Sequence, residues 1–95
     1  MAKVMWNGAV LAESDRCEVV EGNLYFPPDS IRPEYFQPID KTTRCFWKGT
    51  ASYYDIVVNG EVNSGAAWCY ADPKQTANHI KEHVAFYRNK VDIQS

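Results

Sequence analysis

Hydrophobic and polar positions alternate over several short segments of this chain, a pattern typical of strands rather than helices. It predicts strands near residues 3–6 and 9–13, joined by an Asn7-Gly8 turn, and a short strand in "CEVVEGN" that ends at Gly22-Asn23. Asn59-Gly60 predicts a second hairpin turn, between "TASYYDIVV" and "EVNSGAAWCY". Alternation places the first of these segments on two faces: Thr50, Ser52, Tyr54, Ile56 and Val58 on one, and Ala51, Tyr53, Asp55 and Val57 on the other.

The segment "YFPPDSIRPEYFQPIDKT" interrupts this pattern, since it holds four of the five prolines. Each proline removes a backbone donor and fixes φ, so we expect an ordered loop with one helical turn near residues 30–35 rather than a regular strand. Its aromatic side chains predict that the loop packs on the body of the protein as a flap. They are Tyr25, Phe26, Tyr35 and Phe36.

The last third of the chain contains the one helix start signal. Asp72 is a potential cap, Pro73 suits the first helical position, and Gln75 completes a pattern similar to a capping box, so we expect a helix of about two turns over residues 73–81. The end, "HVAFYRNKVDIQ", predicts a last hairpin that turns at residues 88–90. The sum is a single domain over residues 1–95, mainly β (α+β), with one short helix.

Composition narrows the classes of function. The chain has 95 residues, an aromatic share of 14% and a net charge of -2, and no cluster of Lys or Arg predicts an extended nucleic-acid surface. No apolar run is long enough for a membrane span and no signal region is visible, so the cytoplasm is the expected compartment. The odd number of cysteines (Cys17, Cys45 and Cys69) argues against a closed disulfide framework and favours small buried side chains.

Familiar catalytic and metal-binding motifs are weak or absent. His79-Ile80-Lys81-Glu82-His83 matches the H-x-x-E-H pattern of inverted zinc peptidases, but the predicted helix ends near Lys81 and no third ligand is evident. The three cysteines lack the paired spacing of zinc ribbons. No nucleophile elbow, phosphate loop or dinucleotide fingerprint appears. We therefore expect no metal or cofactor.

The segment "CFWKGTASYY" places Lys48 among aromatic and small residues, directly before Gly49. Its stem can pack on an aromatic ring while the ammonium reaches water, which is the ordinary explanation. The functional alternative is that Gly49 admits a ligand close to the backbone and Lys48 offers a charge to a phosphate or carboxylate. Two further segments, "EGNLYFP" and "AAWCYADP", mix aromatic and polar groups in the same way, as small-molecule sites do.

The motifs "VVEGNLYFPPDS", "CFWKGTASYY", "GAAWCYADP" and "IKEHVAFY" together resemble the domain of unknown function 427 family over nearly the whole chain. That family usually has proline after the cysteine of "CPWKG", where this chain has Phe46. The resemblance implies antiparallel strands in a fold that looks like the β-tent of methionine sulfoxide reductase B and of the cereblon thalidomide-binding domain. Relatives of that fold hold zinc with two cysteine pairs, which are missing here.

The resemblance also implies a pocket between the sheets. The family motifs map onto seven expected lining residues: Glu21, Tyr25, Trp47, Lys48, Tyr53, Trp68 and Tyr70. A nucleotidyltransferase-like label given to the family would require acidic residues that hold Mg²⁺, for which Glu21, Asp55 and Asp72 are the candidates.

Three hypotheses follow for the function. The first is a small-molecule binding domain in which Lys48 attracts an anionic or carbonyl group and Glu21 fixes a donor of the ligand. The second is an enzyme that uses Lys48 with a depressed pKa, or Cys45 as a thiolate, or that transfers nucleotidyl groups. The third is a protein-interaction module that exposes the aromatic flap of residues 25–36. Ligand identity and oligomeric state are left open.

Overall fold

The protein is built from three antiparallel sheets in a computed structural model that describes all of residues 1–95. The strands are β1 (Ala2–Trp6), β2 (Ala9–Ser14), β3 (Glu18–Val20), β4 (Asn23–Tyr25), β5 (Phe36–Cys45), β6 (Gly49–Val58), β7 (Glu61–Cys69), β8 (Val84–Phe86) and β9 (Asp92–Gln94). Their orders are β2-β1-β9, β3-β4 and β5-β6-β7-β8. The helical content consists of short 3₁₀ segments only: η1 (Pro28–Ser30), η2 (Pro33–Tyr35) and η3 (Gln75–Ile80). The prediction of a mainly β domain is confirmed.

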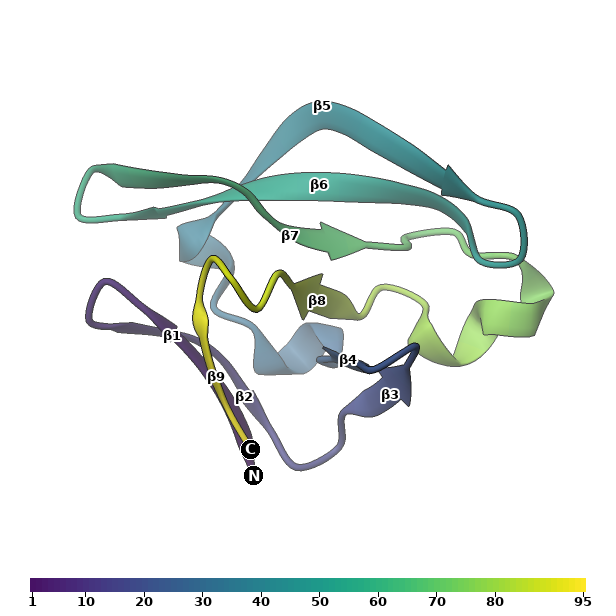
Figure 1. Cartoon of the computed structure of the whole chain (residues 1–95), viewed down its shortest axis with the longest axis horizontal. Coiled ribbons are helices and arrows are strands. Elements are labelled where there is room, and N and C mark those ends of the chain that lie inside the picture. Colours follow the sequence, from purple (N-terminus) through teal and green to yellow (C-terminus); the bar gives the residue numbers. More distant parts are fainter.

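Figure 1 shows how the sheets lie relative to one another. The long strands β5, β6 and β7 run along the top of the view, the β2-β1-β9 sheet lies below them on the left, and the β3-β4 hairpin lies on the lower right. Both termini meet at the bottom, because β1 and β9 pair with each other. Backbone hydrogen bonds between Phe26 and Val84, of 2.8 and 2.9 Å, join the end of the β3-β4 hairpin to β8.

Alternation along β6 and β7 sends side chains into two hydrophobic cores. Tyr54, Ile56 and Val58 contact the first core, while Ala51 and Tyr53 belong to the second, as the alternation predicts. The first core holds 13 buried residues and lies largely between the long sheet and β1-β2. We call the second the aromatic core; its buried members are Val20, Tyr25, Ala51, Tyr53, Trp68, Tyr70, Ala77, Ile80 and Ala85.

Both Asn-Gly turns form the predicted hairpins, β1-β2 and β6-β7, with Asn7 at φ 51° and Asn59 at φ 52°. The sequence analysis missed a third hairpin, β3-β4, which turns at Glu21 (φ 54°) and Gly22 (φ 80°). Glutamate is not a residue expected in the left-handed region, so this turn carries no obvious sequence signal.

The expectation of a loop through the whole proline-rich segment is wrong at its C-terminal end. Residues 28–35 form the two 3₁₀ turns, but β5 begins at Phe36 and runs through Pro38. This is possible because β5 is the edge of its sheet, where a missing N–H on the outer side breaks no ladder bond. An irregularity between Ile39 and Thr42 then adjusts the register. The flap itself packs inward, with Tyr25 and Phe26 fully buried, as predicted.

Two expectations for the last third of the chain are corrected. The helical segment is η3, which forms 3₁₀ turns broken by a kink at Ala77, and Asp72 does not cap it. The expected terminal hairpin is also wrong, because β8 pairs with β7 whereas β9 crosses to β1. The turn predicted at residues 88–90 forms, yet the strand after it joins a different sheet, and local sequence does not determine that pairing.

Candidate functional site

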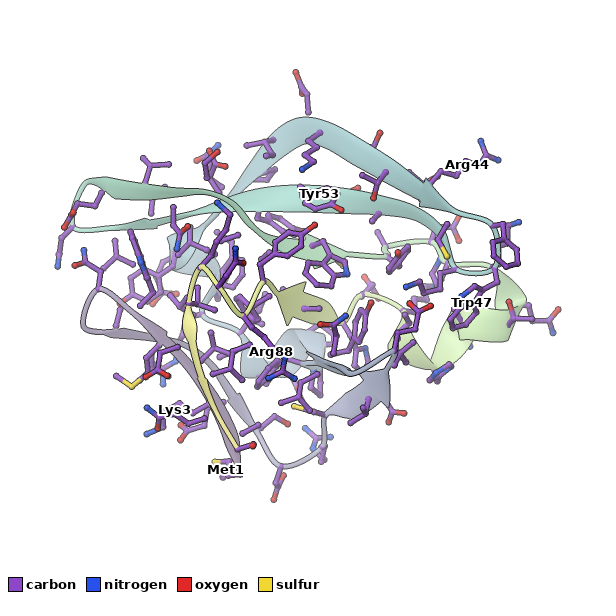
Figure 2. The ribbon with its side chains drawn as sticks, viewed as in Figure 1. Met1, Lys3, Arg44, Trp47, Tyr53 and Arg88 are labelled. Carbon is purple, nitrogen blue, oxygen red and sulfur yellow. The ribbon has the colours of Figure 1, made fainter.

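The structure gathers the sequence-predicted site residues on one side of the long sheet, in or beside the aromatic core. Tyr53 on β6 and Trp68 on β7 come from neighbouring strands, Tyr25 comes from β4 of the two-stranded sheet, and Tyr70 directly follows β7. Trp47 lies in the β5-β6 turn, packed against the same core. Figure 2 shows Tyr53 on β6 and Trp47 beyond the end of β5, near η3.

Lys48 and Glu21 form a salt bridge at one end of this core. The Lys48 side chain is only 9% exposed, whereas that of Glu21 is 52% exposed. The Lys48 Nζ atom also lies 5.3 Å from the ring centroid of Tyr70 and 5.5 Å from that of Trp47, distances typical of cation–π contacts. The ammonium is thus enclosed by two rings and one carboxylate.

This enclosure shifts both pKa values. Burial is the largest single effect on the pKa of Lys48 and lowers it, but the hydrogen bond to Glu21 and the charge interactions with Tyr25, Tyr70 and Glu21 together outweigh burial and hold that pKa above its ordinary value. The hydrogen bond from Lys48 lowers the pKa of Glu21. Both groups are therefore charged at neutral pH, and the positive charge of Lys48 is already compensated within the protein.

The β5-β6 turn that carries Lys48 is fixed by backbone contacts to the segment before η3. Lys74 donates its backbone N–H to the Lys48 carbonyl at 2.9 Å, and the Thr76 hydroxyl donates to the Trp47 carbonyl at 2.7 Å. Gly49 has φ 108°, and a Cβ atom there would lie 3.4 Å from the Lys74 nitrogen. The glycine is needed for the turn and the close packing of this segment, which the sequence analysis had linked to ligand approach.

The aromatic rings form a contiguous series across the sheet. The Trp68 indole N–H donates to the Tyr25 hydroxyl at 3.1 Å, and their rings meet edge to face. Trp68 also contacts Tyr87, with ring centroids 4.7 Å apart, and Tyr87 stacks on Tyr53 at 6.4 Å. Tyr87 is the member of this series that the sequence analysis missed, because its segment was expected to form a hairpin arm.

Hydrogen bonding and burial also raise the pKa values of two tyrosines beside this core. A hydrogen bond with Tyr53, together with burial, raises the pKa of Tyr87 to about 12. Burial raises the pKa of Tyr70, although the nearby Lys48 charge acts in the opposite direction. Both phenols are neutral near pH 7 and act as hydrogen-bonding groups rather than as charges.

Beside the far end of this series lies a hollow of about 330 Å³. Its lining residues are Ile39, Lys41, Ser64, Gly65, Tyr87, Asn89 and Lys90. None of the seven residues predicted from the family motifs lines it, but it adjoins them, since Ile39 and Tyr87 both pack against the aromatic core. The Lys41 Nζ atom lies 4.5 Å from the ring centroid of Tyr53. Gly65 is the one sequence signal for this region, which the sequence analysis did not use, because an isolated glycine in a strand often marks a bulge.

The weaker motifs do not assemble. Helix η3 ends at Ile80 and Glu82 has φ 63°, so His79 and His83 do not lie one turn apart on a helix. No group of three or more His, Cys, Asp or Glu side chains is placed to hold a metal ion. The three candidate carboxylates, Glu21, Asp55 and Asp72, therefore do not form a metal site. Asp55 instead accepts a hydrogen bond from the Gly65 backbone N–H at 2.7 Å.

The cysteines are all free thiols. Cys69 is buried, as expected for a small core side chain, and burial raises its pKa to about 11. Cys17 and Cys45 are half-buried. The helical segments have three to six residues, so none of them could span a membrane.

The sequence model of the domain of unknown function DUF427 matches residues 1–95. The chain belongs to this family. The match spans the whole aromatic core and the hollow beside it, but the family's description assigns no activity. A search of curated proteins finds no significant match.

Proposed function

We propose that this DUF427 domain binds a small anionic molecule on the aromatic side of its long sheet. The observation that carries the proposal is the gathering of cationic side chains around the aromatic core of a chain whose net charge is -2. Lys41 lies over Tyr53 and Lys48 lies between Trp47 and Tyr70. Arg88 and Lys90 follow Tyr87 in the turn after β8.

These cations differ in how much of their charge is available to a ligand. Lys48 is paired with Glu21, so its role in the proposal is to hold the β5-β6 turn against the aromatic core. Arg88 donates to the Gly22 carbonyl at 2.9 Å, a neutral acceptor that leaves its charge uncompensated. Lys41 and Lys90 form no salt bridge. Attraction for an anion therefore comes mainly from Lys41 and Lys90, which line the hollow beside the aromatic core, while Arg88 lies next to the β3-β4 turn that carries Glu21.

The geometry favours binding over the two rival classes. A nucleophilic Lys48 needs a depressed pKa, whereas the Glu21 hydrogen bond raises that pKa. An interaction module needs an exposed aromatic flap, yet Tyr25 and Phe26 are fully buried and Tyr35 and Phe36 pack against the first core. A binding domain requires neither feature.

The proposal is tested by ¹⁵N–¹H NMR titration of the 95-residue protein at pH 7.5 with three anions (benzoate, phenyl sulfate and phenyl phosphate) and with neutral benzamide as the matched control. At least one anion should produce saturable shifts in residues of the aromatic side, and benzamide should not. Raising the salt concentration should weaken the binding, because exposed charges are screened. If benzamide and the anions shift the same amides to the same extent, or if none of them binds, the proposal is wrong.

A further inference from the structure

The hollow beside Tyr87 forms where three irregular segments of the backbone meet. Lys41 lies in the irregular part of β5, and the turn after β8 supplies Tyr87, Asn89 and Lys90. The third segment is the register shift between β6 and β7, where Gly65 adopts φ 59°.

Hydrogen bonds fix the β6-β7 segment and the turn after β8 relative to each other, and Lys41 of β5 lies over the Tyr53 ring of β6. The Gly65 N–H donates to Asp55 at 2.7 Å, the Tyr87 N–H donates to the Ala66 carbonyl at 3.0 Å, and the Asn63 side-chain amide donates to the Lys90 carbonyl at 2.8 Å. The hollow is thus a formed feature of the fold, and a ligand that enters it need not order a loop. Preorganisation of this kind lowers the cost of binding.

The chemistry of the lining is that of an oxyanion site. Lys41 and Lys90 provide two positive charges, and no Asp or Glu is among the lining residues. Ser64 and Asn89 provide a hydroxyl and an amide, which can donate hydrogen bonds without adding charge. Contact of Lys41 with the Tyr53 ring, at 4.5 Å, restrains its ammonium at this site.

We infer that this hollow binds a phosphate monoester, with the doubly charged phosphoryl group between Lys41 and Lys90. The inference rests on the proposed function and gives it a site and a ligand class. A phosphate monoester carries about -1.5 to -2 charges at pH 7 and has three strong acceptor oxygens, so it can engage both ammonium groups and the two neutral donors. A carboxylate or sulfate monoester carries one charge and matches the pair of lysines less well. At about 330 Å³, the hollow is near the lower limit for small-molecule sites and suits a phosphoryl group with a small organic substituent.

Isothermal titration calorimetry at pH 7.5 with phenyl phosphate and phenyl sulfate tests the inference, because the two probes share a ring and a tetrahedral group but differ in charge. Phenyl phosphate should bind at least about fivefold more tightly. Lys41→Gln and Lys90→Gln should each weaken phenyl phosphate binding by about fivefold, the upper range for an exposed ion pair. Lys81→Gln is the matched control, since this exposed lysine lies outside the hollow and should leave the affinity unchanged.

The outcomes separate this inference from the broader proposal. Equal affinity for the two probes would overturn the phosphate assignment, and unchanged affinity in the Lys41→Gln and Lys90→Gln variants would overturn the site. In both of these cases the protein still binds an anion, so the proposed function stands. Failure of every anion to bind would overturn both. A ¹⁵N–¹H spectrum of each variant shows that the fold is retained, which is expected because both lysines are exposed.

Discussion

Replacement of Trp68 by phenylalanine tests whether the aromatic core depends on its internal hydrogen bond. Trp68 is 8% exposed and its indole N–H donates to the hydroxyl of Tyr25, which is fully buried. The Trp68→Phe variant leaves that hydroxyl without a partner, at a cost of about 1–3 kcal/mol. The smaller ring loses roughly a further 1 kcal/mol of burial. We expect the free energy of unfolding to fall by about 2–4 kcal/mol in total.

The Tyr25→Phe variant completes a double-mutant cycle. Alone, it leaves the Trp68 N–H unpaired and should also cost about 1–3 kcal/mol. In the Trp68→Phe background it removes the hydroxyl that has lost its partner, so the double variant should be at least as stable as Trp68→Phe alone. The coupling energy between the two sites should therefore be at least about 1 kcal/mol.

Urea denaturation followed by far-UV circular dichroism measures these values without relying on tryptophan fluorescence. In thermal unfolding, each kcal/mol corresponds to about 4–8 °C in Tm for a domain of this size. Tyr54→Phe is the control, because this half-buried tyrosine forms no hydrogen bond through its hydroxyl and should change stability by less than about 0.5 kcal/mol. Additive effects of the two core substitutions would refute the reasoning.

Three further predictions concern the surroundings of the aromatic core. Because the pKa of Glu21 is lowered from 4.5, its salt bridge stabilises the fold fully above about pH 4.5, and this contribution is lost as the pH falls through the lowered pKa. In urea titrations, the difference in unfolding free energy between the parent and Glu21→Gln should therefore shrink below pH 4.5, and a difference that stays constant to pH 3 would contradict this. Cys69, with a pKa of about 11, should react with iodoacetamide at pH 8 about a hundredfold more slowly than a free thiol. Mass spectrometry follows the labelling of each cysteine, and labelling of Cys69 at the free-thiol rate would contradict its burial. Gly49→Ala should lower the free energy of unfolding, measured by urea denaturation, by about 1–2 kcal/mol. The loss should exceed that of the control Gly60→Ala, whose new methyl group meets no atom within 4 Å, and equal losses would show that the contact with Lys74 is unimportant.

The strands could be predicted wherever the signal was local. The two Asn-Gly turns, at residues 7–8 and 59–60, fix the β1-β2 and β6-β7 hairpins because asparagine and glycine tolerate positive φ. β5 was not predicted, because a strand tolerates Pro38 only if that strand lies at the edge of its sheet, and the sequence does not show which strand lies there. The pairing of β9 with β1 is likewise decided by the assembled fold and not by the residues of either strand.

In the candidate site, too, some features could be predicted from neighbouring residues, whereas others depend on the folded chain. The Trp-Lys-Gly unit, residues 47–49, pointed to an unusual cation, and the structure places that cation among aromatic rings. Its pairing with Glu21, 27 residues away, changes the interpretation of Lys48 from a free charge to a structural one. The hollow at Lys41 and Lys90 could not be predicted, since it depends on register shifts in two strand pairs; Gly65 marks an irregularity in β7 but does not tell which segments meet there.

The most direct test of the central claim is the map of amide shifts that phenyl phosphate produces in the ¹⁵N-labelled parent protein. The account predicts saturable shifts concentrated at residues 39–41, 64–65 and 87–90, with smaller changes along the aromatic core and none in the β2-β1-β9 sheet outside β9. Absence of saturable shifts, or shifts centred on the first core and β1-β2, would contradict the claim that the aromatic side of this domain binds an anion.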